Sequence, residues 1–258
     1  MISLIVPIYN EALFLPRCLD SIANQTVPFD EVILIDDESN DGSKQIVVKY
    51  AKQNGWRFML KEHTGVGDTR NAGIEMATGD YITFLDSDDA LFSSAHEAML
   101  NAIEKHKKAD IIQFDHIRMA FGIKNAKPNA EGIYGIDNGL KGLPSFFYYA
   151  WNKIYRRAAI KNHKFCELRF GEDEAFNMEL LCAGLEIQCV NADTVIKYFD
   201  NANSLCHIKT LKELREQDAY LMSLLGKYKG KKQQQLIQDL IHDHRNSRTY
   251  KKMGWRTP

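Results

Sequence analysis

Four short apolar segments alternate with helical patterns in the first hundred residues, and this alternation restricts the fold more than any other feature of the chain. The segments have strand length and nearly continuous hydrophobicity, as in strands covered on both faces: 3–8, 31–35, 57–60 and 81–85. Between them, apolar residues recur at spacings of three and four, which predicts helices at 15–23, 43–53 and 67–77. The alternation predicts right-handed crossovers and an α/β fold with a mainly parallel sheet.

The remainder of the chain has a looser pattern. We expect a helix from Ser93 or Ser94 through Ile103, and then loops and a candidate hairpin over 119–145. Further strands are predicted at 110–114, near Ile187 and near Val195, ordered structure at 151–155, and helices at 173–182 and from Leu211 onward. Because no repeat or low-complexity linker interrupts the chain, we expect one continuous domain over 1–205 and a helical extension over 206–258.

Composition excludes several classes of protein. With 258 residues, 45% of them hydrophobic and 26% charged, the chain can bury a core without disulfides or a structural metal. Its five cysteines are odd in number and scattered, which indicates a reducing compartment: Cys18, Cys166, Cys182, Cys189 and Cys206. No apolar run approaches the roughly 18 residues that cross a bilayer. We therefore expect a cytoplasmic protein, or one peripheral to the membrane.

Charge is distributed unevenly along the chain. Residues 226–258 hold nine Lys and Arg against two Asp, so they carry +7 and residues 1–225 carry −8, within a total of −1. A basic tail on an acidic body indicates contact with an anionic partner, such as a nucleic acid, a phosphorylated glycan or a membrane surface. A solvated C-terminal helix is the alternative.

Polar side chains gather after the predicted strands, where open parallel sheets bind ligands. The last of these clusters holds three carboxylates within four residues: Asp86, Asp88 and Asp89. Three carboxylates so close together repel one another unless a cation lies among them. Oxygen-only ligands suit Mg²⁺ or Mn²⁺, which usually bridge a few carboxylates to substrate phosphates. An acidic turn capping the next helix is the alternative interpretation.

Arg70 and Asn71 begin a predicted helix after the loop at 64–68. A guanidinium and main-chain N–H groups at such a position can hold a diphosphate. The glycines do not match a dinucleotide or P-loop fingerprint, and a solvated arginine in a first turn is the alternative.

Together, these segments resemble a known family. The runs 7–11, 36–43, 70–73 and 79–89 stand in the order and spacing of the family 2 glycosyltransferases of GT-A fold. The resemblance is strong over 1–115, continues thinly through 151–155 and 171–173, and ends near residue 200. It implies a nucleotide-sugar half at 1–115 and an acceptor half at 116–205.

The resemblance assigns a role to particular residues. It implies a nucleotide-sugar pocket lined by Pro7, Tyr9, Glu11, Asp37, Arg70, Asp86 and Ser87, with Asp37 accepting a hydrogen bond from a uracil ring. Asp86 and Asp88 resemble the DxD motif, and the metal, Mn²⁺ or Mg²⁺, is expected on Asp88, Asp89 and His207. The acceptor-binding segment is expected at Trp151, Asn152 and Lys153.

The expected catalytic residues are Asp173 and its neighbour Glu172. Asp173 resembles the general base, which takes the proton from the acceptor hydroxyl while that oxygen attacks the anomeric carbon. One base and one displacement give inversion. The alternative for Asp173 is a carboxylate favoured by the helix dipole. The aromatic run before Trp151, residues 146–149, is either an acceptor-stacking surface or part of the core.

The sequence therefore predicts an inverting, metal-dependent glycosyltransferase. It would move a sugar from a UDP-sugar to a hydroxyl of a saccharide, either a polysaccharide or a lipid-linked glycan. An alternative is transfer to hydroxymethylated or already glucosylated bases in DNA, gripped by a tail in which Tyr250 and Trp255 interleave with basic residues. A non-catalytic nucleotide-sugar binder is the alternative of another class. No motif names the sugar, the linkage or the oligomeric state.

Overall fold

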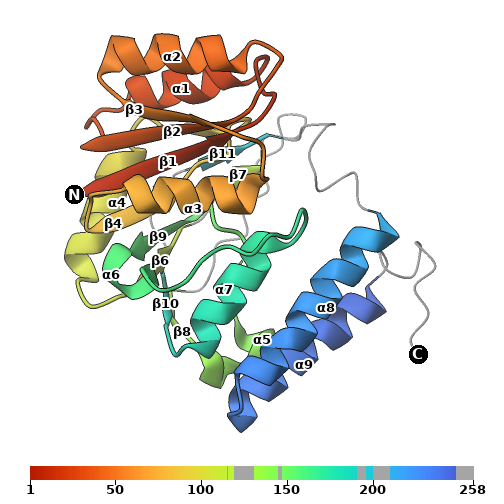
Figure 1. Ribbon diagram of the computed structural model, residues 1–258. Helices are drawn as coiled ribbons and strands as arrows, with labels where there is room; N and C mark the ends of the chain where they lie inside the picture. Colours follow the sequence, from red (N-terminus) through yellow and green to blue (C-terminus); the bar gives the residue numbers. More distant parts are fainter. Residues whose placement is uncertain (115, 119–130, 145–146, 191–195, 200–209, 248–258) are drawn as a thin grey trace.

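The computed structural model describes residues 1–114, 116–118, 131–144, 147–190, 196–199 and 210–247. Within these ranges, eight strands form one sheet in the order β3-β2-β1-β4-β9-β6-β10-β8 (Figure 1). The bounds are β1 Ile2–Ile8, β2 Glu31–Asp37, β3 Arg57–Lys61, β4 Tyr81–Phe84, β6 Ile111–Gln113, β8 Gly132–Tyr134, β9 Lys153–Arg156 and β10 Ile187–Cys189. The predicted α/β class is confirmed.

The strands of the large sheet do not all run in the same direction. β1 pairs in parallel with both β2 and β4, and β2 pairs in parallel with β3, as the alternating pattern predicts. β9 is antiparallel to both of its neighbours, β4 and β6, and β8 is antiparallel to β10. The sheet is therefore mixed, with parallel pairing among β1 to β4 and antiparallel pairing at β9 and β8.

Helices cover both faces of the sheet and enclose two cores. One face carries α1 Leu15–Ala23, α2 Ser43–Asn54 and α4 Ala95–Lys105. The other carries α3 Val66–Met76, α7 Glu172–Cys182, α8 Leu211–Lys227 and α9 Lys231–Asn246. Alternate residues of β1 face the two cores, since Leu4 and Val6 lie in the first and Ile5 in the second. This burial on both sides explains why the strand reads as continuously apolar.

Short elements complete the described structure. A second sheet has the order β5-β11-β7, from β5 Ala90–Leu91, β11 Ile196–Tyr198 and β7 His116–Arg118. The 3₁₀ turn Ile136–Asn138, α5 Gly139–Gly142 and α6 Arg157–Ile160 lie between the longer elements. The four cysteines in the described ranges are free thiols. No helix within those ranges is both long and apolar enough to span a bilayer.

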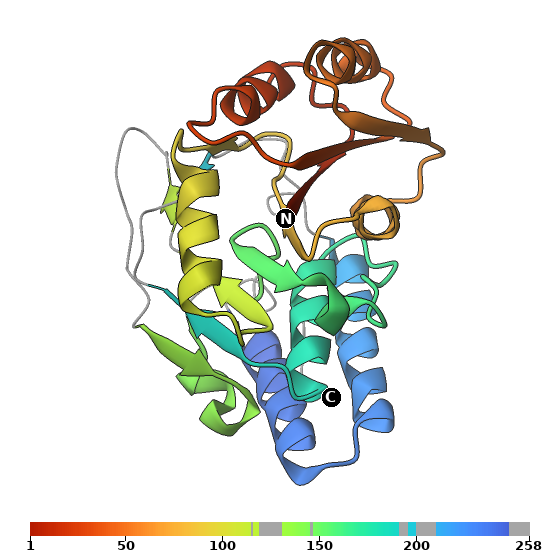
Figure 2. The ribbon, with the colours of Figure 1, turned by 90° about the vertical axis from the view of Figure 1, so that its left-hand side faces the viewer.

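The C-terminal helices pack on the body of the protein. Figure 2 shows α8 and α9 side by side along α7. Leu221 of α8 and Ile237 of α9 are fully buried in the same core as α7. The expected domain boundary near residue 205 lies outside the described residues.

Ion pairs also tie the basic tail to the acidic body. Of the five Lys and Arg residues of the tail that the structure describes, three contact carboxylates, in the pairs Lys227–Glu179, Lys232–Asp137 and Arg245–Asp218. The last four basic residues, and the aromatic residues at 250 and 255, lie outside the described ranges. Part of the tail's positive charge therefore neutralises the chain itself.

Candidate active site

The loops that follow β1 and β2 are joined by hydrogen bonds. The main-chain N–H of Asn10 donates to Ser39 Oγ, and that of Glu11 donates to Ser43 Oγ, both at 2.9 Å. Asn10 and Glu38 each adopt positive φ, of 54° and 66°. Such conformations outside glycine cost energy and concentrate at functional sites. The carboxyl ends of these strands thus form one closely connected surface.

Asp37, the last residue of β2, is enclosed by donors. Its Oδ1 accepts hydrogen bonds from Lys61 Nζ at 2.7 Å and from the Thr64 N–H at 3.1 Å. Its Oδ2 accepts from the Gly65 N–H at 2.9 Å and lies 2.8 Å from His63 Nδ1. Burial opposes ionisation, but these hydrogen bonds together lower the pKa of Asp37. The residue is therefore held as a carboxylate, and its expected contact with a uracil ring stays a prediction.

An aromatic pair lies beside Asp37. The rings of Tyr9 and His63 stack with centroids 4.3 Å apart and planes 23° from parallel. Tyr9 is 45% exposed, whereas Pro7, earlier in the same segment, is buried in β1. An exposed ring next to a fixed carboxylate can stack on a planar heterocycle while its polar edge is hydrogen-bonded.

Carboxylates outnumber cations where the loops after β1, β2 and β4 meet. Burial, followed by the charges of Asp88, Asp41 and Asp86, raises the pKa of Glu11 to about 7, and Arg17 opposes the shift. This excess of negative charge and the oxygen-only donor set fit a divalent cation. No group of three or more metal-ligating side chains converges within the described residues. One or two carboxylates completed by substrate phosphates is the usual arrangement for Mg²⁺.

Arg70 is buried at the centre of a second group of carboxylates. One terminal nitrogen of its guanidinium is 2.7 Å from Glu172 Oε1 and 3.8 Å from Asp173 Oδ1, and the other is 3.0 Å from Asp86 Oδ1. The Arg70 side chain is only 3% exposed. Although burial opposes the charge, these carboxylates raise the pKa of Arg70 further. The structure thus brings together residues that the sequence separates by up to about a hundred positions.

Glu172 and Asp173 begin α7 directly after Gly171, which has a φ of +82°. Glu172 is 8% exposed, and burial, followed by the charge of Asp173, raises its pKa well above the usual value. Asp173 is 15% exposed and its Oδ2 accepts a hydrogen bond from the Ala150 N–H at 3.2 Å. Of the two, Asp173 is the one open to a substrate.

Ser87 and Asp89 are buried. Asp89 is fully covered; its Oδ1 accepts a hydrogen bond from the Phe199 N–H at 2.9 Å, and burial raises its pKa well above the usual value. Its Oδ2 has no hydrogen-bond partner among the described residues. Asp89 therefore lies behind its neighbour Asp88, and its role as a metal ligand stays a prediction. His207 lies outside the described residues.

Comparison with known proteins identifies the family. Residues 3–164 match the model of glycosyl transferase family 2. The chain belongs to this family. EpsJ of Bacillus subtilis, an uncharacterized glycosyltransferase, is 28% identical over 81% of this chain and 63% of its own length. GgaB of the same organism, a minor teichoic acid biosynthesis protein, is 33% identical over 66% of this chain and 20% of its own. The chain thus spans less than two thirds of these family 2 relatives.

Solved structures share the fold of this family 2 chain. S. aureus TarS 1–349 in complex with UDP-GlcNAc aligns with a TM-score of 0.76 and 22% identity, over 96% of this chain and 74% of that one. The mannosyltransferase PcManGT from Pyrobaculum calidifontis, with GDP-Man and Mn²⁺, aligns with a TM-score of 0.64 and 16% identity, over 95% and 70%. The predicted GT-A fold is confirmed.

The expected acceptor segment of this family 2 chain lies beneath the surface. Trp151 stacks on Tyr149 with centroids 5.0 Å apart, and Asn152 and Lys153 are almost fully buried. Lys153 Nζ donates to Asn152 Oδ1 at 2.8 Å and to the Tyr149 carbonyl, and burial lowers its pKa to about 7. Acceptor binding by these residues stays a prediction, since each packs against protein here.

Sequence reasoning missed three residues of the candidate site. Lys61 ends β3 and His63 follows it, and the sequence analysis assigned no residue at the carboxyl end of this strand. Arg17 of α1 donates to the Asp88 carbonyl and lies over the Phe199 ring, 3.5 Å from its centroid. Searching the end of β3 finds the first two. No sequence signal marks Arg17, because its partner is a main-chain carbonyl 71 residues away.

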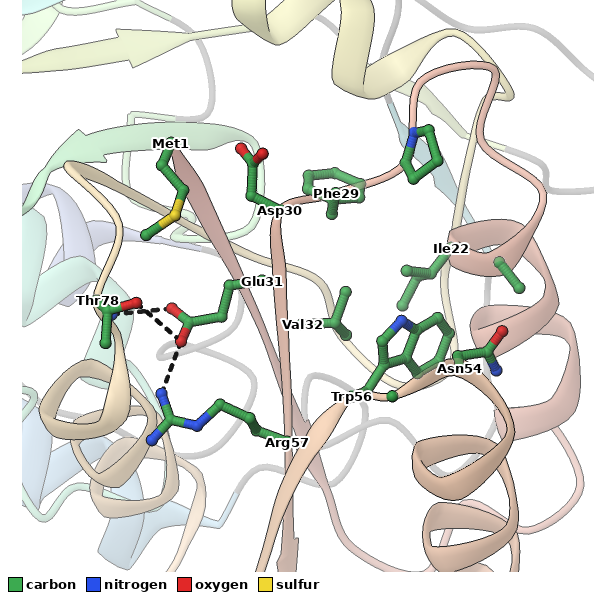
Figure 3. A pocket seen from close by; sticks show the side chains of 13 residues that line it. Met1, Ile22, Phe29, Asp30, Glu31, Val32, Asn54, Trp56, Arg57 and Thr78 are labelled. Atoms are coloured by element: carbon green, nitrogen blue, oxygen red, sulfur yellow. Dashed lines mark hydrogen bonds and ion pairs between the residues drawn. The ribbon is translucent and has the colours of Figure 1, made fainter.

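A cavity of about 430 Å³ lies at the opposite edge of the sheet, at the amino ends of β1, β2 and β3 (Figure 3). There Glu31 contacts Arg57 Nη1 at 2.6 Å and accepts from the Thr78 N–H at 2.8 Å. Ser3 Oγ donates to it as well. Burial opposes the charge, but these hydrogen bonds lower the pKa of Glu31 to about 2. None of the predicted site residues lines this cavity.

Proposed function

We propose that this chain is an inverting glycosyltransferase that moves a sugar from a UDP-sugar to a hydroxyl of a saccharide acceptor, with Mn²⁺ or Mg²⁺ as cofactor. One observation carries the proposal: the Arg70 guanidinium contacts Asp86, from the donor-side motif, and Glu172 and Asp173, from the acceptor side. A nucleotide sugar and an acceptor can react only where their binding groups meet, and these groups meet here.

The donor is assigned to the surface formed by residues 1–115. Tyr9 and His63 offer a stacking face for a base, and Asp37 beside them offers a fixed acceptor. The structural neighbour TarS was solved with UDP and with UDP-GlcNAc, which supports a uridine nucleotide. Asp88, assisted by Asp86, would hold the divalent cation. The bound cation would supply electrostatic stabilisation to the departing diphosphate.

Asp173 acts as the general base in this proposal. Glu172 is the more deeply buried of the pair and contacts Arg70 at 2.7 Å, whereas Asp173 is the more exposed and lies 3.8 Å from Arg70, so Asp173 is the one we place at the acceptor. Asp173 takes the proton of the acceptor hydroxyl, whose oxygen bonds to the anomeric carbon as the bond to the diphosphate oxygen breaks. A single displacement inverts the anomeric configuration.

A saccharide acceptor is favoured over modified DNA. Three basic residues of the described tail already neutralise carboxylates of this chain, so their charge is not available to phosphates. The teichoic acid relative GgaB supports an acceptor that is part of a cell-envelope polymer. In this proposal, residues 116–205 form the acceptor half and 206–258 the extension.

Substitution of Asp173 and Asp88 tests the proposal. With Mn²⁺, Asp173→Asn should bind UDP-sugar as the parent does but transfer it about 10²–10⁴-fold more slowly, the usual contribution of a general base. Asp88→Asn should lose Mn²⁺-dependent donor binding in calorimetry. The control is Asp137→Asn, which removes an exposed carboxylate paired with Lys232.

The outcomes separate the competing functions. Labelled transfer would be measured to oligosaccharides, envelope polymers and hydroxymethylated DNA in parallel. Full activity of Asp173→Asn would contradict the assignment of the base. Binding of UDP-sugars by the parent, without transfer to any acceptor or to water, would identify a nucleotide-sugar binder instead.

A further inference from the structure

The two C-terminal helices contact the first turn of α7, one residue beyond Asp173. Glu174 Oε2 accepts a hydrogen bond from Gln217 Nε2 of α8 at 2.7 Å. His244 Nε2 of α9 lies 3.0 Å from the same oxygen and 3.2 Å from Oε1. The side chains of Glu174 and His244 are 14% and 16% exposed. Two helices distant in sequence thus converge on one carboxylate next to the catalytic pair.

Close packing extends this contact to the residue before the pair. Gly171 adopts positive φ, and a Cβ built on it would lie 2.2 Å from Gln217 Nε2. The α8 side chain therefore occupies the space that any larger residue at 171 would need. Arg245 makes a two-pronged ion pair with Asp218, with nitrogen–oxygen distances of 3.1 and 2.7 Å, and this pair holds the last turn of α9 against α8.

Three acidic groups face His244. Glu174 faces it from α7, Asp218 from α8 and Asp243 from its own helix. Burial opposes protonation, but the charge of Glu174, its hydrogen bond and the other two carboxylates raise the pKa of His244. The contact with Glu174 is therefore an ion pair while His244 is protonated, a state that the raised pKa extends to higher pH, and it weakens when His244 loses its proton.

We propose that His244 is a positioning residue for the general base: its contact with Glu174 fixes the first turn of α7 and, through it, the direction of Asp173. This inference rests on the proposed function. The donor residues Asp37 and Asp88 lie on other elements, and the first turn of α7 meets the donor side through the Arg70–Asp86 contact, so the contact of His244 should act on transfer far more than on donor binding. A mere stabilising contact would change the free energy of unfolding and leave the pH profile of the folded enzyme unchanged.

The experiment compares His244→Gln with Lys227→Gln. Gln at 244 keeps a hydrogen-bond donor but does not titrate. Lys227 contacts the same helix at Glu179, further along α7, and so reports the effect of a lost ion pair that does not touch the first turn. For each variant, kcat and KM for the donor are measured from about pH 6 to 9, the range in which histidine titrates. UDP affinity and the unfolding midpoint are measured on the same samples.

We expect His244→Gln to lower kcat by about 2- to 30-fold at neutral pH, the range of coupling through a residue that contacts neither ligand. UDP affinity should stay at the parent value. The parent should lose kcat as the pH rises through the pKa of His244, and the variant should lack that decline. Glu174→Gln should reproduce this behaviour, and the double variant should be no worse than either single one. His244→Lys, which keeps the charge, should retain kcat to higher pH.

Superimposable pH profiles of parent and His244→Gln would overturn the inference, as would an equal kcat loss in Lys227→Gln. Both results presuppose an active parent. A parent that binds no UDP-sugar with Mn²⁺ would instead overturn the proposed function, so the two failures are distinguishable.

Discussion

Two groups of carboxylates lie at the same edge of the sheet and differ in how their charge is balanced. Around Glu11, three carboxylates from the loops after β2 and β4 add to the effect of burial and raise the pKa of Glu11. The guanidinium of Arg17 opposes this shift. Around Arg70, a buried guanidinium lies among Asp86, Glu172 and Asp173. Both groups hold more carboxylates than guanidinium groups, and Asp86 belongs to both. They differ in that Arg70 is buried and contacts its three carboxylates directly, whereas Arg17 is exposed, so the group around Arg70 is the better balanced of the two.

The difference indicates which part of the site depends on a ligand. Like charges held together are unfavourable until a cation joins them, and the group around Glu11 is where we propose that metal and diphosphate bind. The group around Arg70 has a buried cation in direct contact with its carboxylates before any substrate arrives. Donor binding should therefore depend on metal, while the geometry of the base should not.

Removal of the central guanidinium tests the balanced group most severely. Arg70→Met should lower the free energy of unfolding by about 3–5 kcal/mol, because it leaves buried carboxylates without a partner. Denaturant unfolding at neutral pH measures the loss. As a control, Arg57→Met removes a guanidinium that is 46% exposed and paired with one carboxylate, Glu31. An equal loss of unfolding free energy in Arg70→Met and Arg57→Met would contradict the special role given to the buried guanidinium.

Glu31, at the opposite edge of the sheet, tests whether hydrogen bonds can balance a carboxylate as Arg70 does. Its folded pKa of about 2 lies below the reference value of 4.5, so its contribution is present above about pH 4.5 and is lost as the pH falls through about 2. Glu31→Gln should cost about 2 kcal/mol at neutral pH and remove this acid dependence. Urea unfolding against pH checks it. An unchanged acid profile would show that another carboxylate is responsible.

Neutralising a carboxylate in the unbalanced group should have the smallest effect and the opposite sign. Without divalent cations, Glu11→Gln should raise the free energy of unfolding by about 1 kcal/mol, because it relieves repulsion. Addition of Mn²⁺ should reduce this gain in the free energy of unfolding. Thermal unfolding at pH 8 with a chelator measures it, with Glu62→Gln, an exposed carboxylate, as the matched charge change. A destabilised Glu11→Gln would show that this group is balanced too.

Sequence reasoning predicted the first half of the fold well because the information there is local. β1, β2 and β4 are buried on both faces, and each intervening helix has its own apolar spacing. Those features are visible within a dozen residues. The expectation that 57–60 is also covered on both faces is wrong, because β3 is the edge strand and its apolar residues at 58–60 are 37–42% exposed. The antiparallel direction of β9 was not predictable, because strand direction depends on the path of a long connection and not on the strand's residues.

The candidate site shows the same division between local features, which the sequence reveals, and contacts between distant residues, which it does not. Asp37 and Asp86 stand at strand ends, where a parallel sheet collects its polar groups, and the pattern located both. The contact between Arg70 and Glu172 spans 102 residues, and spacing carries no information over that distance. No sequence signal marks His244 for the same reason, since its partner Glu174 is 70 residues away.

β9 also bears on how the protein can move. It is hydrogen-bonded to β4 of the donor half on one side and to β6 on the other, so a single ladder runs from β3 to β8. A hinge between the two halves would have to break that ladder, so the halves cannot open and close as separate lobes. Under the proposed function, closure around a sugar would therefore come from the loops at the sheet edge, with Glu172 and Asp173 held on α7.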